Sequence, residues 1–361
     1  MPLPEAGRAR AQPVAARWAI RLASVLYGFG ARVDRVWRTS RRGTRGRPAC
    51  AVVSVGGITV GGAGKTPVAA RLAWALSQRG HRVAVASRGY RGRAREAVTV
   101  VSDATRVHSS VEQAGDESLV LTAHAPGVPV LVGRDRRVVG HHAVAAFGTE
   151  ILVLDDGFQH HGLERDVDVV CLDGVEGLGN GLVLPAGPLR EPPSALQHTD
   201  LLCLIDAPAD PPFLAELMRW VGKEMTVWRA HRRPVGLIPL QGGPSRSPEV
   251  LAGRRVGLLA GIARPGSLRR TLEALGAEVV REYALPDHHR YRACDLAGLS
   301  ESGDAGLDGW VTTEKDALKI LPKWLPPGVN LEVLRVELEF EEEAGLVDAI
   351  EDRLRGASRL R

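Results

Sequence analysis

The chain has 361 residues, 44% hydrophobic and 25% charged, which is the composition of an ordinary globular protein with enough length for two domains. Four cysteines without a C-x-x-C pair argue against structural zinc and for a reduced, cytosol-facing protein, and aromatic residues at only 4% argue against a nucleic-acid partner. The net charge of +5 is uneven, because residues 1–47 hold eleven arginines against Glu5 and Asp34, so we expect the N-terminus to meet an anionic surface.

Residues 13–33 are predicted to form an amphipathic helix. Its apolar face carries Trp18, Leu22, Val25, Leu26 and Phe29. Because Arg17, Arg21 and Arg32 interrupt the segment, we expect neither a membrane span, which needs about 20 apolar residues, nor a secretory signal. We expect the apolar face to enter a membrane interface, with the arginines that follow on anionic head groups; the alternative is a helix packed on the protein's own core. Those arginines are Arg35, Arg38, Arg41, Arg42, Arg45 and Arg47.

A phosphate-binding loop is predicted between a strand and a helix. The β-branched run Ala51–Val55 indicates a buried strand, and Leu72 and Leu76 share one face of the helix that starts at Lys65. Glycines let backbone N–H groups surround phosphate oxygens, the lysine reaches the β/γ-phosphates and the threonine hydroxyl binds Mg²⁺. The expected nucleotide-binding residues are Thr59, Val60, Gly61, Gly62, Ala63, Gly64, Lys65 and Thr66. Thr59 stands where the pattern G-x-x-x-x-G-K-[ST] has its first glycine, and the alternative is a glycine-rich turn that happens to precede a helix.

Charged and polar side chains follow two further predicted strands, His81–Ser87 and Val128–Gly133. Ligands of doubly wound sheets gather at the carboxyl ends of strands, so we expect phosphate or substrate here; the alternative is a solvated basic turn. The candidates are Ser87, Arg88, Tyr90, Arg134 and Arg136.

Two adjacent carboxylates, Asp116 and Glu117, precede a predicted helix. Such pairs are often only capping groups. If Asp116 lies near the γ-phosphate, its carboxylate would take the proton of an attacking hydroxyl.

A second nucleotide motif follows, because four apolar strand residues, Ile151–Leu154, end in Asp155. This is the Walker B arrangement, in which the aspartate holds Mg²⁺, and with the phosphate-binding loop it indicates a nucleoside triphosphate and Mg²⁺. A metal site made of His160 and His161 is not expected, since adjacent strand residues point to opposite faces. Further candidates here and in the glycine- and proline-rich loop 177–193 are Asp156, Gln159, His160, Arg190 and Glu191.

The second half predicts another alternating β/α unit, with strands at Arg255–Gly261 and Glu278–Tyr283. The expected fold class is therefore α/β: a P-loop NTPase-like parallel sheet domain plus a second, smaller Rossmann-like α/β domain, with an N-terminal amphipathic helix. The expected divisions are a basic membrane-interface segment 1–47, a P-loop kinase domain 48–225, a linker or crossing 226–254 and a C-terminal α/β domain 255–361. We also hypothesise that Val333–Phe340 pairs with Thr226–Ala230 as a two-stranded crossing.

Several of these blocks resemble the tetraacyldisaccharide 4′-kinase family, the lipid A 4′-kinases of Gram-negative envelope synthesis. They are TVGGAGKTP at 59–67, SRGY at 87–90, GDE at 115–117, GRDRR at 133–137, DDGFQH at 155–160, RD at 165–166, GNG at 179–181, LPAGPLRE at 184–191, PDHH at 286–289 and TTEKDA at 312–317. Two positions depart from the family pattern: Gly57 replaces an asparagine, and Arg91 stands where glycine is common.

The resemblance implies transfer of the γ-phosphate of ATP, with Mg²⁺, to the 4′-hydroxyl of tetraacyldisaccharide 1-phosphate at the cytoplasmic face of the inner membrane. It implies Asp116 as the base and a histidine of PDHH as its support, for which we prefer His288 over His289. Thr66 and Asp155 are expected to hold Mg²⁺, and Arg134, Arg136 or Arg190 to neutralise phosphate charge. We expect neither a nucleic-acid partner nor an obligate protein partner.

Two other functions fit the nucleotide motifs alone. One is a P-loop kinase of another hydroxyl acceptor, against which the amphipathic N-terminus and LPAGPLRE argue. The other is a nucleotide-gated, membrane-associated switch. A switch that recognises guanine would carry the motif Asn-Lys-x-Asp, and the order Thr313-Glu314-Lys315-Asp316 does not match it.

Overall fold

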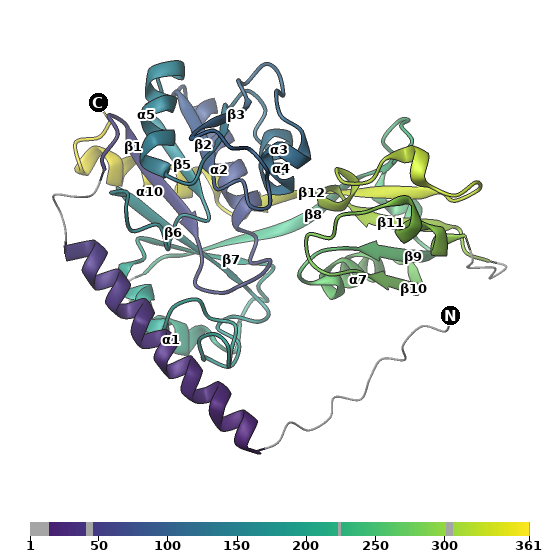
Figure 1. Cartoon of the computed structure of the whole chain (residues 1–361), viewed down its shortest axis with the longest axis horizontal. Helices are drawn as coiled ribbons and strands as arrows, with labels where there is room; N and C mark the ends of the chain where they lie inside the picture. The colour runs from purple at the N-terminus through teal and green to yellow at the C-terminus, as the bar shows by residue number, and fades with distance from the viewer. Residues whose placement is uncertain (1–13, 41–45, 223–224, 301–305, 361) are drawn as a thin grey trace.

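The computed structural model describes residues 14–40, 46–222, 225–300 and 306–360. Within them a twelve-stranded sheet runs through the molecule, with helices on both faces (Figure 1). In spatial order the strands are β10 (Glu278–Ala284), β9 (Arg255–Ala260), β11 (Gly309–Thr313), β12 (Leu331–Phe340), β8 (Val227–Pro239), β7 (Leu201–Ile205), β6 (Val167–Asp173), β1 (Ala51–Gly56), β5 (Ile151–Asp155), β2 (Val83–Ser87), β4 (Val130–Val132) and β3 (Thr99–Ser102). Neighbouring strands are parallel except β8 with β12 and β3 with β4, as expected for an α/β fold.

The helices follow the strands in the alternation that the sequence predicts. They are α1 (Val14–Ser40), α2 (Lys65–Gln78), α3 (Val111–Ala114), α4 (Asp116–His124), α5 (Arg136–Phe147), α6 (Leu214–Val221), α7 (Pro265–Ala274), α8 (Ala293–Leu296), α9 (Glu314–Ala317) and α10 (Glu343–Gly356). Short 3₁₀ turns lie at Pro193–His198, Pro248–Leu251, Ala297–Leu299 and Pro322–Trp324.

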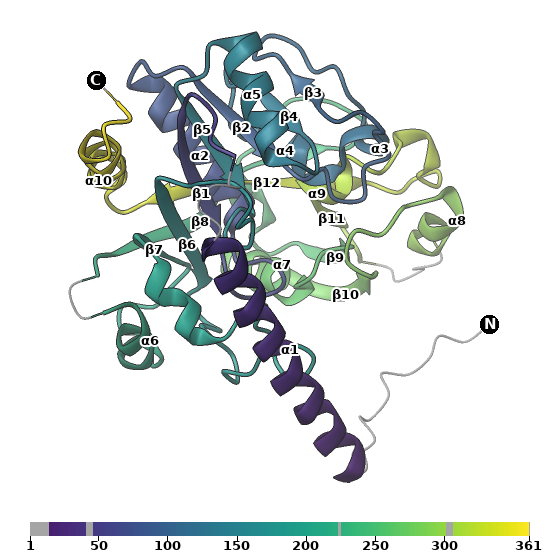
Figure 2. The same ribbon diagram turned by 60° about the vertical axis from the view of Figure 1, so that its left-hand side comes forward.

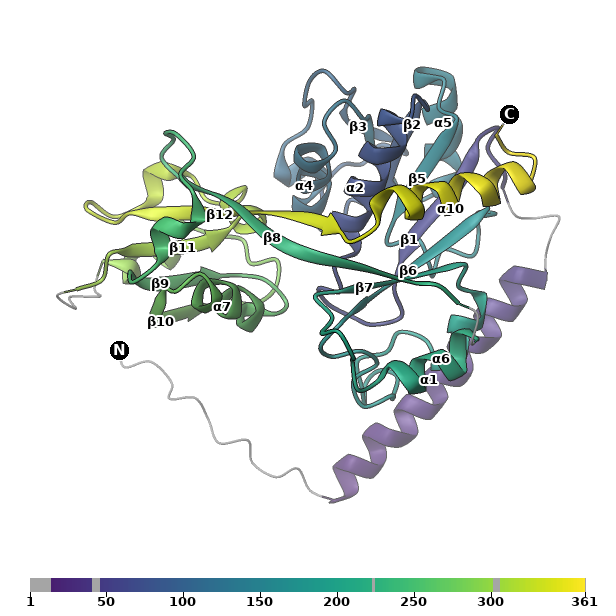
Figure 3. The ribbon, with the colours of Figure 1, turned by 180° about the vertical axis from the view of Figure 1, so that it is seen from behind.

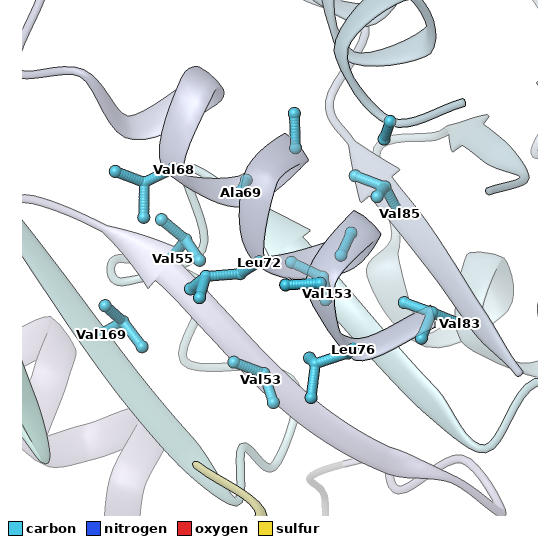
Figure 4. Packing of buried hydrophobic residues seen from close by; sticks show 14 of the residues in the cluster. Val53, Val55, Val68, Ala69, Leu72, Leu76, Val83, Val85, Val153 and Val169 are labelled. Atoms are coloured by element: carbon cyan, nitrogen blue, oxygen red, sulfur yellow. The ribbon is translucent and has the colours of Figure 1, made fainter. Parts of the chain in front are cut away.

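The core of the first half forms where α2 packs on the parallel sheet. Figure 4 shows Leu72 and Leu76 of α2 beside Val53 and Val153 of the strands beneath it. All four side chains are fully buried, which removes the apolar face of α2 from water and fixes the phosphate-binding loop at its N-terminus.

The segment expected to be a linker or crossing at 226–254 begins as the long strand β8, so residues 227–239 belong to the sheet and are not an irregular linker. Its arginines, glycines and prolines suggested irregular structure, but Pro234 lies beside a register shift against Val336, where a missing N–H donor is tolerated. The hypothesised two-stranded crossing is confirmed in part: β12 pairs with β8, but of the expected partners 226–230 only Ala230 lies opposite β12, at Phe340. The pairing with β12 extends from Ala230 to Pro239, however, whereas residues 227–230 pair with β7.

Strands β8 and β12 connect the two halves of the molecule (Figure 3). After β12, helix α10 packs on α2, and its Leu346, Ile350 and Leu354 join the core of the first half. The division into domains 48–225 and 255–361 stays a prediction.

Helix α1 runs along one side of the molecule and projects beyond it (Figures 1 and 2). Its apolar face does not pack on the protein's core: Trp18, Leu22 and Phe29 are 66%, 63% and 68% exposed. The helix instead docks through Ser24, whose hydroxyl donates to the Val183 carbonyl oxygen at 2.7 Å, and through the buried Arg35. No helix in the described ranges is both long and apolar enough to cross a bilayer.

The arginines that were expected to contact anionic lipid head groups differ in their surroundings. Arg35 is buried against Glu191 and is not available to lipid, which corrects that part of the prediction. Arg47 pairs with Glu164 and Asp166. Arg41, Arg42 and Arg45 lie outside the described residues.

Candidate functional site

A cavity of about 970 Å³ opens at the carboxyl ends of the central strands, between the two halves of the molecule. The phosphate-binding loop forms one wall, and segments around α7, α9 and residues 287–288 form the opposite wall. Asp34 and Arg38 of α1 line the same cavity, so the exposed helix and the nucleotide motifs border one space.

The loop before α2 has the geometry of a phosphate cradle. Gly61 and Gly64 have φ of 90° and 74°, the left-handed region that glycine adopts without strain. Lys65 is buried, and its Nζ lies 3.3 Å from the Gly61 carbonyl oxygen, folded back over the loop. Thr59 forms a bridge to Leu189 instead of facing the cavity, which explains why a β-branched residue fits where the pattern has glycine.

Asp155 at the end of β5 is placed to hold a divalent cation. Its carboxylate accepts hydrogen bonds from two neutral hydroxyls, Thr66 at 3.2 Å and Ser87 at 3.3 Å. Burial, together with the charges of Glu117 and Asp156, raises the pKa of Asp155 to about 7. A buried carboxylate in this state gains from a cation, so Thr66 and Asp155 fit Mg²⁺.

No cluster of three or more His, Cys, Asp or Glu capable of holding a metal occurs among the residues that the structure describes. Mg²⁺ at a nucleotide takes one or two protein groups and completes its shell with phosphate oxygens and water, and Thr66 and Asp155 are two such groups.

Asp116 and His288 form a buried pair across the two halves. The Nδ1 atom of His288 lies 3.0 Å from Oδ2 of Asp116, and both residues are less than 10% exposed. Burial alone would raise the pKa of Asp116, but the His288 hydrogen bond and the charges of Lys315, His288 and Lys319 hold it at about 2. His289 instead contacts Asp295 at 3.1 Å, so the structure brings the preferred histidine to Asp116.

His288 is held from several sides. The Tyr90 ring meets the imidazole edge-on at 5.2 Å, and the Lys315 Nζ lies 3.3 Å from its Nε2. Arg91 donates to the His288 carbonyl oxygen at 2.9 Å. Arg91 has a φ of 61°, in the left-handed region that glycine adopts without strain, which explains why glycine suits this position. The strained backbone of Arg91 thus occurs at a residue whose side chain contacts the opposite half of the molecule.

A chain of polar contacts links the loop lysine to the LPAGPLRE block. Asp156, at 3.6 Å from the Lys65 Nζ, accepts from Arg190 at 2.7 Å. Arg190 also lies 3.4 Å from Oε1 of Gln159, whose Nε2 donates to Glu191 at 3.0 Å. Glu191 is itself buried and does not line the cavity.

A basic edge borders the cavity near α1. Arg88, Arg134 and Arg136 line it together with His160. The Arg136 Nη1 donates to the Gly133 carbonyl oxygen at 2.9 Å, and burial lowers the pKa of this guanidinium to about 10. Burial and the charges of Arg136 and Arg165 lower the pKa of His160 to about 4, so this imidazole is neutral at physiological pH.

The structure brings most of the predicted residues to the cavity, while Thr59, Val60, Asp116 and Glu191 lie behind its wall. Sequence reasoning missed Lys319, whose Nζ lies 3.5 Å from Asp116, and Arg264, which lines the cavity and pairs with Asp173 at 2.7 Å. The only sequence signal for Lys319 is its spacing of four residues from Lys315, and Arg264 had none beyond its place after a strand.

Known proteins resemble this chain over most of its length. The family model described as "Tetraacyldisaccharide-1-P 4'-kinase" matches residues 16–355. The tetraacyldisaccharide 4'-kinase of Anaeromyxobacter dehalogenans (strain 2CP-C) is 44% identical over 308 residues, covering 84% of this chain and 81% of that one. That of Syntrophus aciditrophicus (strain SB) is 41% identical over 284 residues, covering 76% of each.

Among solved structures, LpxK from Aquifex aeolicus, described as an "apo" form in complex with ATP, superposes with a TM-score of 0.72 at 27% identity. The match covers 94% of this chain and 99% of that one.

Proposed function

This chain belongs to the tetraacyldisaccharide-1-P 4′-kinase family, and from that premise we propose how its residues carry out the reaction. The protein uses ATP and Mg²⁺ to phosphorylate the 4′-hydroxyl of tetraacyldisaccharide 1-phosphate, a step of lipid A biosynthesis. We propose that phosphoryl transfer takes place in the cavity between the phosphate-binding loop and His288.

The observation that carries the site assignment is the Asp116–His288 contact at the cavity that Lys65 also lines. His288 and Glu117 line the cavity that also contains Lys65 and Asp155, whereas Asp116 is buried behind the imidazole. We propose that this pair takes the proton of the sugar hydroxyl. Because His288 is the member of the pair that lines the cavity, we propose that the proton passes to the ring and that Asp116 stabilises the imidazolium that forms. This division differs from our expectation of Asp116 as the direct acceptor.

The nucleotide is held by backbone and charge. Loop amides and Lys65 hold the β- and γ-phosphates, with Thr66 and Asp155 as the Mg²⁺ ligands. Held there, Mg²⁺ would neutralise negative charge on the phosphates. Arg190, anchored on Asp156, lines the same cavity and would neutralise charge on the transferring group.

The basic edge is proposed to recognise the acceptor's 1-phosphate. Arg88, Arg134 and Arg136 offer guanidinium donors, and the neutral His160 adds a polar ring. Ser87, Tyr90 and Gln159 support the neighbouring groups through their contacts with Asp155, His288 and Glu191.

Helix α1 is proposed to seat the protein on the cytoplasmic face of the inner membrane. Its apolar side chains are exposed, and its last turns border the cavity, so a lipid-bound acceptor meets the site where the helix meets the surface. Neither a nucleic acid nor an obligate protein partner is part of the proposal.

The test is transfer of labelled γ-phosphate from ATP to tetraacyldisaccharide 1-phosphate in detergent micelles. We expect lipid-dependent transfer by the wild-type chain, none by Lys65→Ala, and a loss of about 100-fold or more in His288→Ala. Phosphorylation of another hydroxyl acceptor only, or ATP hydrolysis indifferent to lipid, would instead support the two alternative functions. Near-normal turnover by His288→Ala would remove the pair from the mechanism.

A further inference from the structure

The docking of α1 reaches the transfer site through one buried ion pair. The Arg35 guanidinium makes two hydrogen bonds to Glu191, at 2.6 and 3.0 Å, and both side chains are at most 8% exposed. The guanidinium also lies over the Phe158 ring, 4.7 Å from its centroid, and Phe158 is fully buried. Arg35 therefore contacts both the LPAGPLRE block and the segment that follows Asp155.

Glu191 lies next in the chain to Arg190 and shares Gln159 with it. Gln159 donates to Glu191 through Nε2 at 3.0 Å and to the Gly57 carbonyl oxygen at 3.0 Å, while its Oε1 faces Arg190. Arg190 in turn holds Asp156, the carboxylate 3.6 Å from the Lys65 Nζ. Asp156 thus holds the Arg190 guanidinium directly, and Glu191 is linked to it through Gln159.

We infer that Arg35 is a positioning residue for phosphoryl transfer. By neutralising Glu191, Arg35 keeps that buried carboxylate from drawing Arg190 away from Asp156 and so keeps the groups around Lys65 in place. A buried carboxylate without its partner cation attracts the nearest positive charge, and displacement of a positioning group by about 1 Å is enough to cost roughly 100-fold in rate. The inference rests on the proposed site, in which Arg190 and Lys65 serve transfer.

The same contacts make the site depend on how α1 is seated. Ser24 and Gly28 set the helix against Val183, and a Cβ at Gly28 would lie 3.2 Å from the Val183 Cγ2. Arg35 follows two turns later on the same side and completes the docking. A helix that leaves this surface takes the Glu191 counter-ion with it.

A double-mutant cycle in micelles tests the inference. We expect Arg35→Met to lower kcat by about 10-fold or more while the KM for lipid stays within about threefold, because the exposed face of α1 is untouched. Adding Glu191→Gln removes the competing charge and keeps an amide oxygen for Gln159, so the double variant should recover most of the lost kcat. Arg21→Met, which removes an equal charge from the exposed side of α1, is the matched control.

Three results separate the explanations. Wild-type kcat in Arg35→Met would overturn the inference. Losses that simply add in the double variant would also overturn it, because they would show that Arg35 does not act through Glu191. If wild-type protein fails to phosphorylate the lipid above the Lys65→Ala blank, the proposed function fails instead.

Discussion

The Nδ1 atom of His288 lies 3.0 Å from Oδ2 of Asp116, across 172 residues of sequence and across the boundary between the two halves of the molecule. Asp116 begins α4 of the first half, whereas His288 has φ of 57° in a loop of the second half. The pair exists only while the halves meet, because its two partners come from different halves. Formation of the proton-accepting pair therefore depends on the β8–β12 crossing, which connects the two halves.

Replacing Asp116 tests whether this residue only orients the His288 imidazole or also stabilises its protonated form. We expect Asp116→Asn to lower kcat by about 100-fold or more, since an amide no longer stabilises a protonated imidazole. The pH–rate profile checks the division of roles: if the ring holds the proton, the acidic limb of kcat/KM shifts in Asp116→Asn. A reduced rate with an unchanged profile would return the acceptor role to a group other than His288.

The stability that Asp116 contributes should disappear in acid. Its folded pKa of about 2 lies below the ordinary value of 3.8, so its contribution is fully present above about pH 4 and is lost as the pH falls towards 2. The shift corresponds to about 2 kcal/mol of unfolding free energy at neutral pH. Denaturant unfolding of wild type and Asp116→Asn at several pH values measures it, and a difference that does not shrink in acid would contradict the assignment.

Asp155 should have the opposite effect on how the stability of the folded protein depends on pH. Its pKa of about 7 lies above the ordinary 3.8, so ionisation costs the folded protein stability as the pH rises between these values. Without nucleotide, Asp155→Asn should therefore unfold at a higher temperature than wild type, with a gap that grows from about pH 4 to about pH 7. Adding Mg²⁺ to the ATP-bound protein at pH 8 should stabilise the wild type more than the variant; an equal increase would exclude Asp155 as a metal ligand.

Local patterns predicted the elements that position the nucleotide, because a strand, a glycine loop and an apolar helix face are each set by neighbouring residues. The starts of β1 at Ala51 and of α2 at Lys65, and the place of Asp155 at the end of its strand, followed directly. Residues whose role depends on a distant segment did not: the sequence placed Arg35 on lipid, and nothing nearby showed that Glu191 would bury it. Composition also misled at β8, where a strand bulge accommodates Pro234.

The apolar face of α1 offers a test of membrane seating that leaves the fold alone. Leu22, Leu26 and Phe29 are 63%, 64% and 68% exposed, so a triple change to serine should hardly alter the melting temperature. Each large apolar side chain contributes about 1.5–3 kcal/mol when it leaves water, so binding to anionic phospholipid vesicles should fall by about 100-fold or more. Val107→Ser, at a 57% exposed position elsewhere, is the control, and unchanged sedimentation of the triple variant would move the membrane contact away from α1.

Arg134 tests recognition of the acceptor's 1-phosphate. It lines the basic edge of the cavity and is exposed, whereas the buried Arg136 is tied to the Gly133 carbonyl oxygen and would be harder to replace without structural loss. A charged hydrogen bond to phosphate is worth about 1.5–3 kcal/mol, so Arg134→Gln should raise the KM for the lipid by about 10- to 100-fold and leave the KM for ATP unchanged. The exposed Arg106, outside the cavity wall, gives the matched control Arg106→Gln. An acceptor without the 1-phosphate should be used equally well by wild type and Arg134→Gln; if the variant is still impaired with that acceptor, Arg134 acts on the sugar or the nucleotide rather than on the 1-phosphate.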